Sequence, residues 1–315
     1  MSRKSKFVNL FLLFGGLPVL VFGLQSGSYS FKKDFPLLLT QDLNGLKTSD
    51  GKIIRQSLLN IDSKFRNIID CYKIEYLSDG LKVIGFVSKP REIDSKLPVI
   101  LFNRGGCLEF GKVTEEDLKY LSLLASKGYV ILASQYRGND GGEGHEEFGG
   151  RDVNDVLNLI PLAKSLPFAD SSKMVMLGYS RGGMMTYLAM KEGAPIKAAA
   201  IVSGISDLFQ VYQKRNQNPN KRLQYVIKRL VGIDTEKYRK RSACFWPERI
   251  TVPLLILHGE DDPIVDVSQA RRMGEKMHAL GKTCELIVLS KGGHGLNTLR
   301  NQRDRKIMEW FEEYR

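Results

Sequence analysis

The sequence predicts an α/β fold, with one mostly parallel sheet of eight strands and helices on both of its faces. Strand-like and helical segments alternate along most of the chain. Several strands, such as Val99–Phe102 and Leu254–Leu257, are continuously apolar, which is typical of central parallel strands covered on both faces. The chain has 315 residues, of which 43% are hydrophobic and 26% are charged. This mixture indicates a globular protein with one large core and excludes collagen-like, disordered and coiled-coil proteins.

The predicted strands begin with a hairpin around Asp79-Gly80, a dipeptide that favours the tight turn between antiparallel strands. Six further strands alternate with helices, as expected of repeated strand-helix units. An amphipathic segment over 53–69 predicts one short helix before the sheet. The eight predicted strands are 72–78, 81–88, 97–103, 129–136, 173–179, 196–204, 253–258 and 284–290. The other predicted helices are 115–127, 152–165, 181–192, 268–281 and 296–314.

These segments divide the chain into three parts. We expect 1–26 to be a signal peptide or membrane anchor, 27–69 to be an N-terminal extension with the short helix, and 70–315 to be the α/β domain. A cap insertion over 208–247 interrupts the alternation between the sixth and seventh strands. It holds ten Lys and Arg residues against two acidic ones and contributes much of the formal charge of +12. No zinc-knuckle, RNP-type or helix-turn-helix pattern accompanies this charge, so we expect no nucleic-acid partner.

The first 26 residues have the order of an export signal. Residues 1–6 are cationic, and residues 7–24 are almost wholly apolar before a polar stretch. Because the apolar run is long for a cleaved signal, an uncleaved anchor is a second interpretation, and a buried N-terminal helix is a third. Either export interpretation places the rest of the chain outside the cytoplasm, in the periplasm or the extracellular space, with membrane association through this segment as one form.

A serine in a Gly-rich turn is the candidate nucleophile. The segment 178–182 matches G-x-S-x-G, in which a sharp turn between a strand and a helix exposes the serine hydroxyl. An apolar strand precedes the motif and a helical pattern follows it. This context makes Ser180 the predicted nucleophile.

A serine hydroxyl needs a neighbouring base, and histidine suits that role near neutral pH. The chain has four histidines, of which His294 follows the eighth strand between glycines. His145 is expected to be a solvated loop residue, His258 structural, and His278 a packing or surface residue on a helix. We therefore predict that His294 is the base.

The base in turn needs a carboxylate that fixes its tautomer. Glu260, Asp261 and Asp262 all follow the seventh strand, and the chemistry of the side chains does not choose among them. Nucleophile, acid and base then lie behind the fifth, seventh and eighth strands. Because the carboxyl ends of parallel strands form one edge, we expect the three side chains to meet there.

Two backbone N–H groups are needed for the oxyanion that forms during attack on a carbonyl. The amide of Arg181, directly after the nucleophile, is one candidate. The other is expected in the Gly-Gly turn 103–107 after the third strand, from either Gly106 or Cys107.

No metal cluster, phosphate loop or dinucleotide motif is visible, so the sequence implies no cofactor. The four cysteines, at 71, 107, 244 and 284, are too widely spaced for a disulfide scaffold or a paired metal site. Disulfide pairing and buried thiols both stay open.

These residues resemble the α/β-hydrolase catalytic domain of the prolyl oligopeptidase family of serine peptidases, over about 70–315. The matching segments are 78–85, 104–106, 136–138, 178–183, 258–265 and 293–295. In the family pattern H-G-x-x-D-x-x-V the aspartate is the acid, so the resemblance selects Asp262. The chain has no segment for the N-terminal propeller of the family peptidases and no evident glutamate pair for a peptide amino terminus. Glu146-Glu147 is interpreted as a solvated acidic loop.

The residues and the resemblance together predict a serine hydrolase that cleaves an amide or ester bond through an acyl-enzyme. A peptidase acting on short peptides is the first interpretation, and an exported carboxylesterase is the alternative. A hydrolase-like binding protein without catalysis is the third. The fold alone does not separate the first two, since it hosts both activities.

Overall fold

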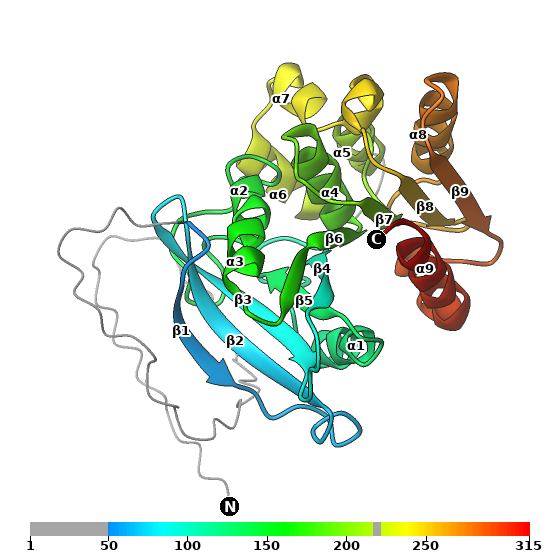
Figure 1. Ribbon diagram of the computed structural model, residues 1–315. Helices are drawn as coiled ribbons and strands as arrows, with labels where there is room; N and C mark the ends of the chain where they lie inside the picture. Colours follow the sequence, from blue (N-terminus) through cyan, green and yellow to red (C-terminus); the bar gives the residue numbers. More distant parts are fainter. Residues whose placement is uncertain (1–49, 217–221) are drawn as a thin grey trace, which may run out of the picture.

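The computed structural model describes residues 50–216 and 222–315, and these form one mixed sheet flanked by helices (Figure 1). The sheet has nine strands in the order β1-β2-β3-β5-β4-β6-β7-β8-β9. Strands β1 to β3 are antiparallel to their neighbours, and β5 onward in this order are parallel. The strands are β1 (Ile53–Leu58), β2 (Ile69–Ser78), β3 (Leu81–Pro90), β4 (Leu97–Asn103), β5 (Val130–Ser134), β6 (Ala169–Tyr179), β7 (Ala198–Val202), β8 (Leu254–Gly259) and β9 (Cys284–Leu289).

The ninth strand is β1, which corrects two predictions. The segment expected as a short helix over 53–69 begins instead with a strand that pairs antiparallel with β2, from Ile53 opposite Tyr76 to Leu58 opposite Tyr72. The sheet therefore starts before residue 70 and has nine strands rather than eight. Two β-branched residues, Ile53 and Ile54, open the segment and favour an extended backbone, and the open edge of β2 supplies hydrogen-bond partners for it.

Helices cover both faces of the sheet, as predicted. On one face, α1 (Glu115–Ala125) and α9 (Arg300–Tyr314) contribute to one hydrophobic cluster. On the other, a second cluster includes residues of the segment 205–250 and of four helices that pack against the sheet. They are α2 (Val153–Leu157), α3 (Leu159–Ser165), α4 (Arg181–Lys191) and α8 (Ser268–Ala279). The helix predicted over 152–165 is thus two short helices that meet at Asn158.

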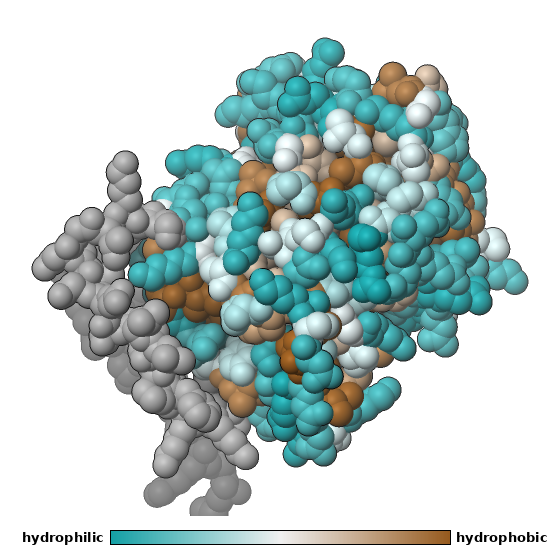
Figure 2. Space-filling view, viewed as in Figure 1, coloured by the Kyte–Doolittle hydropathy of each residue, from teal (hydrophilic) through white to brown (hydrophobic). Residues whose placement is uncertain are grey.

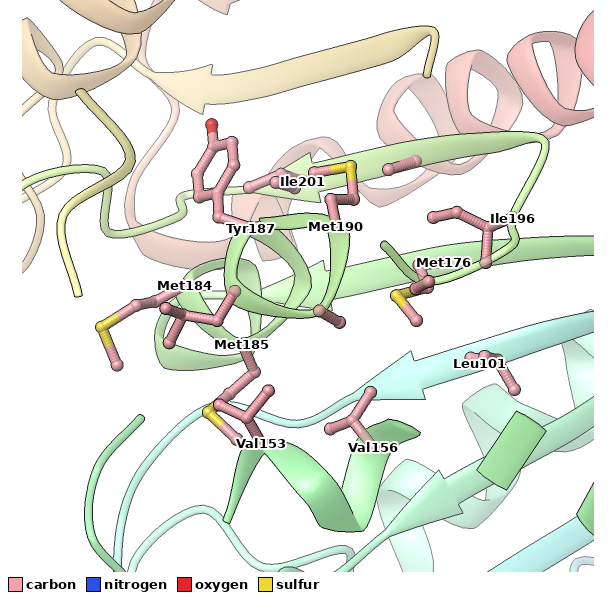
Figure 3. Packing of buried hydrophobic residues seen from close by; sticks show 14 of the residues in the cluster. Leu101, Val153, Val156, Met176, Met184, Met185, Tyr187, Met190, Ile196 and Ile201 are labelled. Atoms are coloured by element: carbon pink, nitrogen blue, oxygen red, sulfur yellow. The ribbon is translucent and has the colours of Figure 1, made fainter. Parts of the chain in front are cut away.

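The central strands supply both clusters because their side chains alternate between the faces. In β4, Val99 and Leu101 belong to the cluster under α2, α3, α4 and α8, whereas Ile100 and Phe102 belong to the cluster under α1 and α9. Figure 3 shows the first of these clusters, where Met185 of α4 lies beside Val153 of α2 and Leu101 of β4 belongs to the same core. This double coverage explains why the central strands are continuously apolar.

Between β7 and β8 the chain leaves the sheet and forms short helices over the region expected to be a cap. These are α5 (Leu208–Asn216), α6 (Arg222–Val231), α7 (Thr235–Lys240) and the 3₁₀ turns η1 (Ala243–Phe245) and η2 (Pro247–Arg249). Phe209 and Tyr212 of α5 both pack against Tyr238 of α7, with ring centroids 5.7 and 5.3 Å apart. An aromatic contact thus holds α5 and α7 together.

The face in Figure 2 is mostly hydrophilic, with scattered apolar side chains between polar ones. In the part of the chain that is described, no helix is both long and apolar enough to cross a membrane. The apolar segment 7–24, expected to be a signal or an anchor, lies outside the described residues. Cys71, Cys244 and Cys284 are free thiols, and Cys107 is buried.

Candidate active site

Ser180 occupies a sharp turn between β6 and α4. Its backbone has φ 55° and ψ −118°, a combination that L-residues rarely adopt. Its N–H donates to the carbonyl of Val202 at 2.9 Å. A Cβ atom added at Gly182 would lie 1.9 Å from the carbonyl oxygen of Asn103, so this position requires glycine. The turn is thus held by close backbone packing against the end of β4.

His294 follows β9 in a loop whose backbone is held from both sides. Gly295, the next residue, donates its N–H to Ser203 Oγ at 3.0 Å and accepts at its carbonyl from Arg303 Nη1 at 2.7 Å. Gly295 has φ 74° and Leu296 has φ 55°, so the loop turns back sharply after the histidine. The His294 side chain is 27% exposed, which leaves the ring accessible to a bound molecule.

Asp262 is the carboxylate that contacts His294. The Nδ1 atom of His294 lies 2.8 Å from Oδ2 and 3.0 Å from Oδ1 of Asp262. The amides of Ile264 and Val265 donate to Oδ1 at 2.8 and 3.0 Å. Because a carboxylate only accepts, Nδ1 carries the proton and Nε2 is left as the acceptor. Glu260 and Asp261, the alternatives from the sequence, are exposed.

A second imidazole contacts the same carboxylate. His258, at the end of β8, is buried, and its Nε2 lies 2.8 Å from the carbonyl of Val265 and 3.4 Å from Asp262 Oδ2. Burial raises the pKa of Asp262, but hydrogen bonds from His258, His294 and the Val265 amide outweigh it and hold the pKa well below its usual range. Asp262 is therefore ionised whenever His294 needs an anionic partner.

Ser180 and His294 line one cavity of about 740 Å³. Gly105, Gly106 and Cys107 of the loop after β4 line it too, as does Arg181. The structure thus brings the six residues predicted from the sequence to the same region, since Asp262 contacts His294 directly. His145 is exposed, and His278 lies on α8. Neither of these two histidines lines the cavity.

An aromatic wall lies beside the nucleophile. Phe102, Tyr120 and Tyr179 line the cavity and contact one another, with ring centroids 5.8 to 6.3 Å apart. The hydroxyls of Tyr120 and Tyr179 share a hydrogen bond of 2.8 Å, and the Tyr120 hydroxyl also donates to Asp304. Burial raises the pKa of both tyrosines, so the wall is neutral. Ile205, Val211 and Val265 add further apolar surface to the cavity.

The loop after β4 is fixed close to Ser180. A Cβ atom added at Gly105 would lie 3.3 Å from Ser180 Cβ, and one added at Gly106, where φ is 69°, would lie 2.1 Å from the Phe110 carbonyl. The carbonyl of Gly106 accepts a hydrogen bond from Arg181 Nη1 at 3.1 Å. In a trans peptide the carbonyl and the following N–H point in opposite directions, so the Cys107 N–H points away from that arginine.

In the described residues, no group of three His, Cys, Asp or Glu side chains could hold a metal ion.

The chain is similar to known proteins of one family. The family model described as the prolyl oligopeptidase family matches residues 117–315. An uncharacterized peptidase of Bacillus subtilis, YtmA, is 32% identical over 249 residues, which is 76% of this chain and 93% of that protein. The chain belongs to the prolyl oligopeptidase family. It is a serine hydrolase with the α/β-hydrolase fold.

A solved structure and a further curated protein are also similar to the chain over about two thirds of its length or more. An acylaminoacyl peptidase of Pyrococcus horikoshii superposes with a TM-score of 0.66 at 26% identity, over 79% of this chain and 42% of that protein. Esterase LipC of Mycobacterium tuberculosis is 25% identical, over 65% of this chain and 55% of that protein. The chain therefore spans nearly all of YtmA but only about half, or less, of these two relatives.

Several residues around the site were not found from the sequence. His258 was interpreted as structural, although it contacts Asp262. Glu146, expected in a solvated loop, is 4% exposed and lies between two arginines. The signal that could have found it is the presence of Arg104 and Arg181 in two tight Gly-rich turns, because buried guanidinium groups require carboxylate partners.

Proposed function

We propose that the protein is a serine peptidase of short peptides, with Ser180 as nucleophile, His294 as base and Asp262 as the acid that orients it. The observation that carries this proposal is one cavity lined by both Ser180, on a strained turn, and His294, whose Nδ1 donates to Asp262. In this mechanism Ser180 Oγ attacks the carbonyl carbon while His294 Nε2 takes its proton.

The tetrahedral intermediate then places negative charge on the former carbonyl oxygen. The N–H of Arg181 and the N–H of Gly106 or Cys107 donate to this oxygen. As the intermediate collapses, the proton on His294 passes to the leaving group and an acyl-enzyme remains. A water molecule, deprotonated by His294, attacks the acyl-enzyme and releases the acid and free Ser180.

The substrate we propose is a short peptide that is neutral or blocked at its amino end. Three carboxylates line the cavity, and each has a partner in the protein: Asp62 and Glu116 contact Lys119, and Asp117 accepts from Thr114. Glu146 is engaged by arginines. A free α-amine therefore finds no unengaged carboxylate here, while the aromatic wall suits an apolar side chain. The similarity to acylaminoacyl peptidases supports the same substrate class.

A carboxylesterase is the second candidate, supported by the similarity to an esterase and by the neutral aromatic wall of the cavity. Purified protein is offered an N-acetyl-aminoacyl anilide, the same anilide with a free amine, and a short-chain nitrophenyl ester. The proposal expects the blocked anilide to be cleaved at least about tenfold more efficiently than the free one. Hydrolysis of the ester alone, with both anilides intact, would favour the esterase. Ser180→Ala is the control for contaminating hydrolases.

We further propose that the segment 1–26 directs export and gives the protein a place in the periplasm or outside the cell. The cationic start and the apolar run 7–24 support this proposal. Cell fractionation and N-terminal sequencing of the mature protein test it. A full-length chain found only in the cytoplasm would contradict it.

A further inference from the structure

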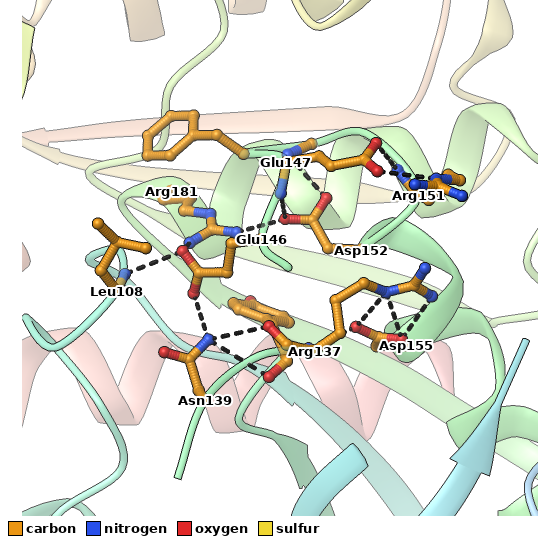
Figure 4. Close-up of polar contacts among 12 residues, drawn as sticks. Leu108, Arg137, Asn139, Glu146, Glu147, Arg151, Asp152, Asp155 and Arg181 are labelled. Carbon is orange, nitrogen blue, oxygen red and sulfur yellow. Dashed lines mark hydrogen bonds and ion pairs between the residues drawn. The ribbon is translucent and has the colours of Figure 1, made fainter. Parts of the chain in front are cut away.

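A buried ion cluster lies next to the loop that carries the predicted oxyanion donors. We define the Glu146 cluster as Arg104, Glu146, Asp152 and Arg181. Figure 4 shows Glu146 and Asp152 on opposite sides of the Arg181 guanidinium. The side chains of all four residues are at most 3% exposed. The two carboxylates balance the two guanidinium groups, which lets four charges be buried together.

Glu146 is the centre of this cluster because each of its oxygens accepts two hydrogen bonds. Oε1 accepts from Arg104 Nη2 at 2.9 Å and from Asn139 Nδ2 at 2.7 Å. Oε2 accepts from Arg181 Nη1 at 2.9 Å and from the Leu108 amide at 2.9 Å. The carboxylate therefore joins the residue after the nucleophile to the loop after β4.

The cluster holds the backbone of that loop at several successive peptides. Arg104 Nη1 donates to the carbonyls of Gly105 at 3.0 Å and Gly111 at 3.2 Å. Arg181 Nη1 donates to the carbonyl of Gly106, and Glu146 accepts from the Leu108 N–H. Since the carbonyls of Gly105 and Gly106 face the arginines, the N–H groups of Gly106 and Cys107 point away from them.

Both arginines depend on Glu146 for their separation and charge balance. Their guanidinium carbons each lie 4.8 Å from the ring centre of Tyr136. Arg181 also stacks on Phe148 at 4.7 Å and pairs with Asp152, whereas Glu146 is the one carboxylate that contacts Arg104 in the described chain. Without the charge of Glu146, the Leu108 amide loses an anionic acceptor and two buried cations face each other.

We propose that Glu146 is a positioning residue that holds the loop 105–108 so that its amides meet the oxyanion of the transition state. The inference rests on the proposed acyl-enzyme mechanism and adds a residue to it. In this role Glu146 is buried and paired with arginines, so its carboxylate is not available to the amino group of a substrate.

The test compares the wild type with Glu146→Gln, using a nitrophenyl ester, a trifluoromethyl ketone and the matching alcohol. The ketone forms a hemiketal with the nucleophile and places an oxyanion in the hole, whereas the alcohol has no carbonyl. We expect kcat to fall by about 10- to 100-fold, since loss of a whole oxyanion donor costs about 10²–10³ in kcat. The ketone Ki should rise by a similar factor, while KM and the alcohol Ki change by less than about threefold.

Glu147→Gln is the matched control, because Glu147 is the adjacent glutamate and pairs with the exposed Arg151 instead. It should keep the wild-type kcat and ketone Ki. Glu146→Asp, which retains the charge with a shorter reach, should recover part of the loss. Equal rises in the ketone and alcohol Ki would overturn the proposal, as would a folded Glu146→Gln protein with wild-type kcat.

Arg104→Lys serves if Glu146→Gln does not fold. The lysine keeps a cation for Glu146. Its single nitrogen cannot replace the guanidinium group, which donates to the carbonyls of Gly105, Gly111 and Gln135. The same selective loss on the ketone is expected, and its absence would overturn the proposal. A wild type that neither cleaves the ester nor reacts with the ketone would instead contradict the proposed function itself.

Discussion

Replacing Asp262 with asparagine is expected to change which nitrogen of His294 carries the proton. The amides of Ile264 and Val265 donate to Oδ1, so the asparagine oxygen stays at that position. Its NH2 group then takes the place of Oδ2, which lies 2.8 Å from His294 Nδ1. Two N–H groups facing each other repel, and the imidazole avoids this by moving its proton to Nε2.

The opposite orientation of the asparagine is disfavoured by the same contacts. It would turn the NH2 group toward the amides of Ile264 and Val265 and remove their acceptor at Oδ1, and for the buried Val265 this costs about 1–3 kcal/mol. His258 Nε2 donates to the Val265 carbonyl and lies 3.4 Å from Oδ2, so it offers no acceptor to the new NH2 group. His294 with its proton on Nε2 has no lone pair for the Ser180 hydroxyl.

We expect kcat to fall by about 10⁴-fold in Asp262→Asn, the size of effect that this exchange has in a serine protease triad. This corresponds to about 5.4 kcal/mol of transition-state stabilisation. Steady-state hydrolysis of a nitrophenyl ester measures it, with circular dichroism to confirm folding. Asp261→Asn is the control, because Asp261 is the exposed neighbour that chemistry alone could not exclude. A folded Asp262→Asn protein within tenfold of the wild-type kcat would refute this reasoning.

Three further predictions follow from contacts around the site. Gly182→Ala should destabilise the fold by about 3 kcal/mol in urea unfolding, because the new Cβ would overlap the Asn103 carbonyl oxygen, 1.9 Å away; unchanged stability would contradict this packing. Ser203→Ala removes the acceptor of the Gly295 N–H and should lower kcat about fivefold with little change in KM; an unchanged kcat would show that the His294 loop does not need this bond. Burial raises the pKa of Glu146, but Arg181 and Arg104 outweigh it and hold the pKa below its ordinary value. Its charge therefore stabilises the fold above about pH 4, and this contribution is lost as the pH falls through the lowered pKa. The Tm deficit of Glu146→Gln should accordingly be largest near neutral pH and shrink below about pH 4; a deficit independent of pH would contradict the ion cluster.

The sequence predicted the fold well where local pattern and burial agree. Continuous apolar runs such as Leu254–Leu257 form interior strands of the sheet, and their side chains contribute to the clusters on both faces. The failure at 53–58 has a physical reason, since a short amphipathic run fits either a helix or an edge strand. Pairing with β2, a partner about twenty residues further along the chain, decides between them.

The site shows the same division between local and long-range information. The turn at Ser180 and the loop of His294 are local features, so their residues could be identified from the G-x-S-x-G motif and from the predicted strands and helix beside them. The choice of Asp262 over Asp261 needed the family pattern, because Asp262 differs from its neighbour in being buried and in accepting from the amides of Ile264 and Val265, which depends on the fold. The role of Glu146 could not be predicted, since its partners Arg104 and Arg181 lie 42 and 35 residues away in sequence.

The central claim is that Ser180 is the residue that becomes acylated. The most direct measurement is peptide mapping by mass spectrometry after reaction of the intact protein with a fluorophosphonate. The account predicts one phosphonyl group per chain, on the peptide that contains Ser180, and none on Ser180→Ala. A label on another residue, or equal labelling of the two proteins, would contradict it.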